Sequence, residues 1–303
     1  MQIFRHIPNK QQLPCALAIG NFDGMHLGHQ ALLEKLTESA KALNLTSAVM
    51  TFEPHPREFF SPETAPARLS SLREKLEHFE EAGVEVTYVC RFNRRLAGLT
   101  PQEFMKNILR DSLNAQAILV GEDFRFGAMR AGSTLDFIEA KFNLIGLPQV
   151  DLENSRVSST RVRSALATGN LQEASLLLNR PYSMSGKVVH GAKLGRELGF
   201  PTANVLMRHE RPALTGVYAV KLDGLNSVAN LGIRPTIAGV SKLMLEVHVI
   251  DFNADLYGKH VHVEFLHKIR DEQKFDGLDA LKAQIALDVE AAKIFFKKLN
   301  INK

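Results

Sequence analysis

Two histidines stand three residues apart in a glycine-rich stretch, Gly20–His29, which reads GNFDGMHLGH. The stretch follows a short apolar run and precedes a segment with helical spacing, so it is predicted to be a turn between a strand and a helix. Such a turn creates an anion site, because the first N–H groups of the helix lack partners within the helix and the helix dipole is positive there. Gly24 and Gly28 would let the backbone approach closely, and His26 and His29 could donate hydrogen bonds to phosphoryl oxygens. The turn is therefore predicted to bind phosphate.

Two other interpretations of these histidines compete with phosphate binding. A single histidine beside a helix start more often caps the helix or packs against it, but two of them with a glycine between disfavour that reading. A zinc site is weaker still, because no third His, Cys or carboxylate ligand is spaced nearby in the sequence.

Length and composition favour a two-domain globular protein. The chain has 303 residues, more than one domain usually holds, with 45% hydrophobic and 23% charged residues. The net charge of +4 comes from 37 basic and 33 acidic residues that are scattered along the chain, which points to small anionic ligands. A nucleic-acid binder would more often show a basic stripe with interleaved aromatic residues, so no nucleic-acid partner is expected.

The cysteines and the hydropathy pattern indicate a cytoplasmic location. Cys15 and Cys90 both lie in apolar, strand-like runs, which is typical of buried thiols in a reducing compartment. The N-terminus lacks the apolar core of a signal peptide, and no stretch approaches the ~18 apolar residues of a membrane span. The sequence therefore predicts neither export nor membrane insertion.

The first half of the chain, from Cys15 to about Leu178, alternates short apolar runs with helical patterns. This alternation predicts a mostly parallel sheet covered by helices on both faces. The sequence predicts a helix start with a capping box at Thr100, Pro101 and Glu103. The expected strands are Ala16–Gly20, Ser47–Phe52, Val84–Phe92 and Ala117–Gly121, and the expected helices are His29–Leu43, Leu69–Ala82 and Pro101–Leu113.

The second half has a period of two. Around Leu245–Val249 and Val261–Phe265 apolar residues alternate with polar ones, as in half-buried antiparallel strands. Further short runs at Ser185–His190, Gly216–Leu222 and Ser227–Ile233 predict a small β-barrel. A closing helix carries an apolar stripe assigned to the core: Leu278, Leu281, Ile285, Val289, Ala292, Phe296 and Leu299.

The motifs resemble those of a known family. HLGH fits the HxGH signature of nucleotidyltransferases, and the longer GNFDGMHLGH resembles the opening of the bacterial bifunctional riboflavin kinase/FMN adenylyltransferases, also called FAD synthetases. The resemblance covers essentially the whole chain. Six further segments agree with the family in order: TFEPHPREFF (51–60), RLSSLREKL (68–76), GEDFRFG (121–127), VSSTRVRSAL (157–166), GKVVHGAKLGRELGFPTANV (186–205) and LEVHVIDFNADLYG (245–258).

The resemblance implies a fold and two consecutive reactions. It implies a Rossmann-like α/β/α nucleotidyltransferase domain over residues 1–182 and an antiparallel Greek-key-type β-barrel with a closing C-terminal helix over residues 183–303. The barrel would phosphorylate riboflavin with ATP to FMN, and the first domain would adenylylate FMN with ATP to FAD, releasing pyrophosphate. Both steps should need magnesium, and the expected partners are small molecules, with the chain a monomer or weak oligomer.

Site residues of the first domain follow from the resemblance. His26 and His29 would orient the ATP triphosphate. Ser159, Thr160 and Arg161 would approach it from the start of a second helix, and the alternative for this segment is an ordinary helix cap. For Phe124 and Phe126, ligand binding and packing into the core are equally favoured. For His55, a solvated position in a rigid loop is nearly as favoured as a contact with flavin or nucleotide. Asp123, where some relatives carry Asn, leaves open whether this side chain donates or only accepts a hydrogen bond. The implied nucleotide contacts are Gly20, Phe22, Gly24, Gly28, Ser159, Thr160 and Arg161, and the implied flavin or nucleotide contacts are His55, Asp123, Phe124 and Phe126.

The barrel would carry the kinase chemistry. Glu246 matches the family's general base and alternates along its strand so that it faces away from Leu245 and Val247. Thr202 and Asn204, two residues apart, could point together at magnesium, although a turn is the alternative for such a segment. Gly186, Lys187 and Gly191 are implied contacts of ATP, in a loop over 186–199 that also holds Lys193 and Arg196 and could act as a flap.

Two rival functions remain open at this point. The chain could be a single-activity adenylyltransferase whose barrel only binds flavin. It could also be a nucleic-acid protein, since HLGH is like the aminoacyl-tRNA synthetase signature, but the expected KMSKS partner is absent and the nearest string is Ser183–Lys187.

Overall fold

The computed structural model describes residues 1–191, 195, 198–207, 211–234 and 242–301. Contacts divide the chain into two compact units, one of Met1–Pro66 with Leu72–Ser158 and one of Ala67–Ser71 with Ser159–Lys303. Lys193 and Arg196 of the predicted flap lie outside the described residues. Within the described ranges, no helix is both long enough and apolar enough to cross a membrane.

The first unit is built on a six-stranded sheet in the order β1-β4-β3-β2-β5-β6, with every pair of neighbours parallel. The predicted parallel sheet is thereby confirmed, and the short edge strands β1 and β6 are additions to it. All five residues of β2 are buried, which fixes this strand in the centre. The strands are β1 (Gln2–Phe4), β2 (Cys15–Ile19), β3 (Thr46–Glu53), β4 (Val86–Arg91), β5 (Ala115–Gly121) and β6 (Asn143–Leu147).

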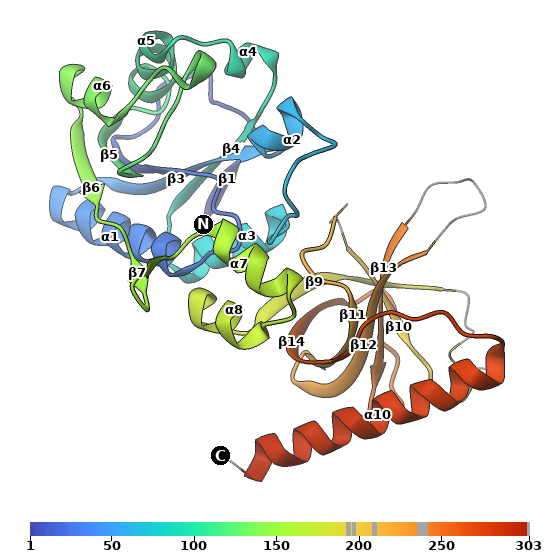
Figure 1. Cartoon of the computed structure of the whole chain (residues 1–303). Helices are drawn as coiled ribbons and strands as arrows, with labels where there is room; N and C mark the ends of the chain where they lie inside the picture. The colour runs from blue at the N-terminus through green and yellow to red at the C-terminus, as the bar shows by residue number, and fades with distance from the viewer. Residues whose placement is uncertain (192–194, 196–197, 208–210, 235–241, 302–303) are drawn as a thin grey trace. The chain divides into compact units, whose positions relative to one another are not determined.

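Helices cover both faces of this sheet, as Figure 1 shows. Alternate residues of β2 enter different cores: Ala16 packs with Leu33 of α1, whereas Leu17 packs with Phe104 and Phe137 on the other face. The helical elements are α1 (Leu27–Leu43), α2 (Pro56–Phe60), α3 (Leu72–Glu81), α4 (Arg94–Ala97), α5 (Pro101–Glu103), the π-helix η1 (Phe104–Arg110), the 3-10 turn η2 (Ala128–Arg130) and α6 (Thr134–Glu139). A hairpin of β7 (Asp151–Leu152) and β8 (Ser155–Arg156) follows β6.

One predicted helix has a different winding. The capping box is present, with the N–H of Thr100 donating to the Glu103 carboxylate at 2.8 Å and the N–H of Glu103 donating to Thr100 Oγ1 at 3.2 Å. After this start, however, the segment predicted as one α-helix to Leu113 continues as η1. The wider turn brings Phe104, Met105, Ile108 and Leu109 together on the buried side, which α-helical spacing would not do as fully.

The second unit is a closed barrel of six antiparallel strands in the order β10-β13-β12-β11-β14-β9, as expected. Leu245, Val247 and Val261 are fully buried, and they alternate with polar residues as the sequence predicts. β10 is a strand that the sequence analysis did not identify. The strands are β9 (Tyr182–Val189), β10 (Ala203–Leu206), β11 (Gly216–Leu222), β12 (Leu225–Arg234), β13 (Lys242–Val249) and β14 (His260–Arg270).

Among the described residues, this unit also holds the helices α7 (Ser159–Ala167), α8 (Leu171–Leu178) and α10 (Leu278–Ile301). Figure 1 shows α10 lying across the outside of the barrel. Its Val289, Ala292 and Phe296 are buried against Val217 and other apolar residues on the outer face of the strands. The first residue of the predicted stripe, Leu278, is 56% exposed and does not belong to the core.

Gly186 belongs to strand β9, so the predicted flap begins only after Val189. A Cβ on Gly186 would overlap the carbonyl oxygen of Leu206 and lie 2.8 Å from Cγ1 of Val205, both on the adjacent strand β10. The glycine is therefore required by close packing of two barrel strands, whatever it contributes to a ligand.

We expect Gly186→Ala to lower the free energy of unfolding by about 1–3 kcal/mol, because the added methyl group forces β9 and β10 apart. Urea denaturation of the full chain measures the change. Gly146→Ala is the matched control, since a Cβ there would meet no atom within 4 Å. Equal stability of the two variants would contradict the packing role of Gly186.

Candidate active sites

Three of the sequence motifs meet at the carboxyl edge of the parallel sheet. GNFDGMHLGH follows β2, TFEPHPREFF overlaps the end of β3, and GEDFRFG begins at the end of β5. The strand order reverses between β2 and β5, and the crevice at such a reversal is where open α/β sheets bind ligands. A cavity of about 1130 Å³ lies here, lined by residues of all three motifs, among them Gly20, Asn21, Arg57, Phe60, Asp123, Phe124 and Phe126.

The histidine turn leads directly into α1. His26 occupies the N-cap position, is 7% exposed, and stacks on His29 with ring centroids 3.7 Å apart. A Cβ on Gly28 would lie 3.3 Å from the His26 ring, so the glycine leaves room for this stack. Phe22 and Gly24 both have a positive φ, which produces the tight turn. The fold therefore places the paired imidazoles at the positive end of a helix, as the sequence predicts, while the turn contributes Gly20 and Asn21 to the cavity.

The two phenylalanines of GEDFRFG differ in their surroundings. Phe126 is 7% exposed and stacks on Phe137 with centroids 4.5 Å apart, so it belongs chiefly to the core. Phe124 is only half-buried, packs beside Phe126 at 5.9 Å, and also lines the cavity. Phe124 is therefore the better placed of the two to contact a ligand.

Asp123 forms a two-pronged ion pair with Arg156, with both N–O distances 2.8 Å. Hydrogen bonds from Arg156, together with its charge, hold the pKa of the Asp123 carboxyl below its usual range. The ionised carboxylate can accept hydrogen bonds but has none to donate, and a contact between Asp123 and a ligand stays a prediction.

His55 has a structural task. It is the N-cap of α2. Its Nδ1 accepts a hydrogen bond from the backbone N–H of Arg57 at 3.1 Å, and its own backbone N–H donates to the Glu58 carboxylate. It does not line the cavity, although Pro56 and Arg57 do. A contact between His55 and a flavin or nucleotide stays a prediction.

The sequence analysis missed an aromatic wall of the cavity. Phe52, Phe60 and Phe92 line it, and the Phe60 and Phe92 rings meet edge to face at 5.6 Å. Phe60 is 65% exposed, which is unusual for so large an apolar side chain unless it faces a ligand. The available signal was the paired Phe59–Phe60 in TFEPHPREFF. The cavity also gains basic and thioether side chains from Arg57, Arg125, Met129 and Arg130.

The SSTRVR segment forms the start of α7, as expected for a helix N-terminus. Nε of Arg161 donates to Glu173 of α8 at 2.8 Å, so part of its guanidinium holds the two helices together. Ser159, Thr160 and Arg161 belong to the second unit, and their approach to the ATP triphosphate stays a prediction.

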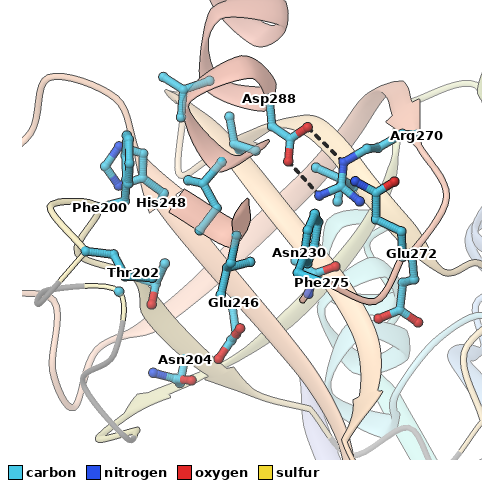
Figure 2. A pocket seen from close by; sticks show the side chains of 18 residues that line it. Phe200, Thr202, Asn204, Asn230, Glu246, His248, Arg270, Glu272, Phe275 and Asp288 are labelled. Atoms are coloured by element: carbon cyan, nitrogen blue, oxygen red, sulfur yellow. Dashed lines mark hydrogen bonds and ion pairs between the residues drawn. The ribbon is translucent and has the colours of Figure 1, made fainter. Parts of the chain in front are cut away.

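A second cavity, of about 170 Å³, lies on the outer face of the barrel. It contains Thr202, Asn204 and Glu246, as Figure 2 shows. Asn204 of β10 is directly opposite Glu246 of β13 in the sheet register, so the two side chains share one face. Glu246 faces away from Leu245 and Val247, as the alternation along β13 predicts, and its side chain lies in this cavity instead of bulk solvent.

Glycine backbone lies against both predicted metal ligands. A Cβ on Gly191 would overlap the Asn204 amide, and one on Gly195 would lie 3.1 Å from Thr202 Oγ1. Gly191 therefore lies beside Asn204, and its contact with ATP stays a prediction. Gly186 and Lys187 belong to β9 and do not line the cavity, so their contact with ATP stays a prediction.

The far wall of this cavity comes from β14 and α10, which the sequence analysis assigned to structure alone. Arg270 holds Asp288 with two hydrogen bonds of 2.8 and 2.7 Å, and Asp288 is 3% exposed. This ion pair, drawn dashed in Figure 2, fixes α10 against the end of β14. His248 donates from Nδ1 to the Pro201 carbonyl at 2.9 Å, which holds its ring at the opposite wall. Apolar residues complete the wall: Val217, Val228, Phe275, Leu281, Ile285 and Val289.

The Asp123–Arg156 pair predicts how the pKa of Asp123 responds to the loss of its partner. Replacing Arg156 by Gln should raise the pKa of Asp123 toward the ordinary value of about 3.9, which an NMR titration of the carboxyl carbon measures. Because the folded-state pKa is lowered, the pair stabilises the fold above the ordinary pKa, and this stabilisation is lost as the pH falls through the folded-state pKa. The two side chains are 50% and 66% exposed, so the effect on stability should not exceed about 1 kcal/mol. An unchanged pKa in the variant would contradict the assignment.

Comparisons with known proteins match both halves of the chain. The family model for FAD synthetase matches residues 8–161, and the model for riboflavin kinase matches residues 178–296. The bifunctional riboflavin kinase/FMN adenylyltransferases of Escherichia coli (strain K12) and Haemophilus influenzae are 47% and 46% identical, each over 98% of this chain. They are covered over 98% and 99% of their own lengths.

A solved structure is also similar over nearly the whole chain. It is described as a macrolide-efflux protein from Streptococcus pneumoniae, is 32% identical, and covers 96% of this chain and 98% of its own, with a TM-score of 0.79. The matches to both family models favour two activities over one. On this evidence, the chain belongs to the bifunctional riboflavin kinase/FMN adenylyltransferase family.

Proposed function

We propose that the two activities of this family are divided along the chain, with FMN adenylylation carried out by residues 1–182 and riboflavin phosphorylation by residues 183–303. The support is that each unit has its own cavity with its own reactive groups. The family models leave a gap between residues 161 and 178, and the proposed boundary lies just after it. Helices α7 and α8 pack in the unit that contains the barrel, so the functional boundary and the packing boundary differ.

In the adenylylation site, the phosphate of FMN attacks the α-phosphorus of ATP and pyrophosphate leaves. Because the nucleophile is already an anion, the protein needs only to align the groups and stabilise the charge that moves to pyrophosphate. His26 and His29 donate hydrogen bonds to the triphosphate, and the first N–H groups of α1 add their partial positive charge.

The aromatic cavity of the first unit suits the flavin ring. A planar, largely apolar ring system stacks well on phenylalanine, and Phe60, Phe92 and Phe124 offer such surfaces. Gly20 and Asn21 line the cavity on the side from which the histidine turn departs, so a flavin bound here would direct its phosphate toward the nucleotide.

In the kinase site, Glu246 is the general base. It takes the proton of the 5′-hydroxyl of riboflavin as that oxygen attacks the γ-phosphorus of ATP, and ADP leaves. The observation that carries this assignment is that Glu246 lies in a cavity, opposite Asn204 and between two fully buried residues. The apolar residues of the cavity's far wall accommodate the flavin ring.

Thr202 and Asn204 fit a magnesium ion. A hydroxyl and an amide carbonyl are oxygen ligands of the kind that magnesium prefers, and the glycine backbone over them leaves space that a side chain would fill. When bound, magnesium would neutralise charge on the phosphoryl groups of ATP.

We also place the enzyme in the cytoplasm. Cys15 and Cys90 are both free and buried, and burial raises the pKa of each thiol to about 12, which makes them unreactive. A monomer or weak oligomer with only small-molecule partners is consistent with the two separate cavities.

Replacing both His26 and His29 by Ala should abolish FAD formation while riboflavin is still converted, so that FMN accumulates. Losing such donors typically lowers the rate by about 10²-fold or more. Chromatography of riboflavin, FMN and FAD over time, with ATP and magnesium present, measures both steps in one assay.

Two controls accompany this double variant. His6→Ala changes an exposed histidine of the same unit and should leave both steps intact. Thermal unfolding tests whether the double variant is folded, since His26 is an N-cap. Normal FAD production by a folded double variant would exclude the phosphate-binding role of the pair.

Glu246→Gln should remove riboflavin phosphorylation and spare FAD formation from supplied FMN. The amide keeps the shape of the side chain but cannot accept the proton, which typically costs about 10²–10⁴-fold in rate. Glu264→Gln is the matched control, because Glu264 is a strand carboxylate of the same barrel that does not line the cavity. Wild-type phosphorylation by the Glu246→Gln variant would favour a barrel that only binds flavin.

A further inference from the structure

Glu246 has a second polar neighbour in the sheet. It is directly opposite Asn230 of β12 on one side, as it is opposite Asn204 of β10 on the other. All three residues line the same cavity, so an amide, a carboxylate and another amide form a row across three adjacent strands (Figure 2). Neither the motifs nor the mechanism above uses Asn230.

The side chain of Asn230 is available to a ligand. Val228 and Asn230, which alternate along β12, both face the cavity, whereas Ala229 and Leu231 between and beyond them are fully buried in the barrel. Within the described part of the chain, the Asn230 amide takes part in no side-chain hydrogen bond. An asparagine that lines a cavity in this state offers both a donor and an acceptor to whatever fills it.

The position of Asn230 relative to Glu246 indicates what it would contact. Side chains of directly opposed residues in an antiparallel pair stand about 4.5–5.5 Å apart at Cβ, so both can reach neighbouring groups of one ligand. Glu246 acts on the terminal hydroxyl of the sugar-alcohol chain of riboflavin. The next group along that chain is another hydroxyl, which both donates and accepts hydrogen bonds, as an amide does.

We propose that Asn230 binds a hydroxyl of the ribityl chain next to the one that is phosphorylated, and thereby makes the kinase selective for a flavin with a polyhydroxylated chain. This inference rests on the proposed role of Glu246. The contact fixes the direction in which the chain enters the site, so that the terminal oxygen reaches Glu246. Asn204 lies on the other side of Glu246, where it is assigned to magnesium. The phosphoryl group would therefore lie beside Asn204, and the ribityl chain beside Asn230.

A polar group built to bind a hydroxyl discriminates against a ligand that lacks it, because the amide is then left without a partner in a confined space. A flavin whose side chain is 5-hydroxypentyl keeps the reacting hydroxyl and lacks all the others. The wild-type enzyme should therefore phosphorylate this analogue less efficiently than riboflavin, and part of that difference should come from Asn230.

The test compares kcat/KM for riboflavin and for the 5-hydroxypentyl analogue in the full-length wild type and in Asn230→Ala. We expect the variant to lose about threefold to tenfold with riboflavin, the range for one hydrogen bond between neutral groups, and to be unchanged with the analogue. Asn226→Ala is the matched control: Asn226 lies on the same strand and the same face but does not line the cavity. Thermal unfolding of each full-length variant reports whether the barrel is folded.

Two outcomes overturn the proposal. Riboflavin kinetics that match those of the wild type would show that Asn230 contacts no hydroxyl, and an equal loss with both substrates would show that it only supports Glu246. Glu246→Gln separates this failure from a failure of the proposed site. If Glu246→Gln removes phosphorylation and Asn230→Ala leaves selectivity unchanged, the kinase site stands and only the role of Asn230 is wrong.

Discussion

The chemistry that we propose for the barrel depends on the alternation of side chains along β13. Leu245 and Val247 are fully buried in the barrel interior, so the backbone between them cannot shift without opening the core. Glu246 must then face outward, and the neighbouring strands bring Asn204 and Asn230 to either side of it. A carboxylate held in this way is positioned before substrate arrives, which is what a general base requires.

In the first unit, a parallel sheet fixes the position of the side chains assigned to the site. β2 is buried along its whole length and packs on both faces, so the point at which the chain leaves its carboxyl end is fixed. The turn that follows uses positive φ at Phe22 and Gly24 to redirect the chain into α1, and the stacked pair His26 and His29 lies at the helix start. A fully buried strand in the first unit, and a strand with alternate residues buried in the second, thus fix the positions of the side chains to which we assign the chemistry.

The sequence predicted the features that depend on interactions between residues close together in the chain. The capping box at Thr100, the strand periods and the outward direction of Glu246 all depend on neighbouring residues. The parts that were missed depend on distant contacts: the apolar residues of η1 are buried against the sheet, and the Arg270–Asp288 pair joins a strand to a helix. The cavity walls are missed for the same reason, since their members are adjacent only after folding.

The central claim is that one chain holds two reaction sites that work independently. Mixing the His26→Ala/His29→Ala variant with the Glu246→Gln variant, and supplying only riboflavin, ATP and magnesium, tests it most directly. Neither variant alone should make FAD from riboflavin, because the first stops at FMN and the second cannot make FMN. The account predicts that the mixture makes FAD, as FMN released by one molecule is adenylylated by another. A mixture that forms FMN but no FAD, while the Glu246→Gln variant still converts supplied FMN at the same concentration, would contradict it.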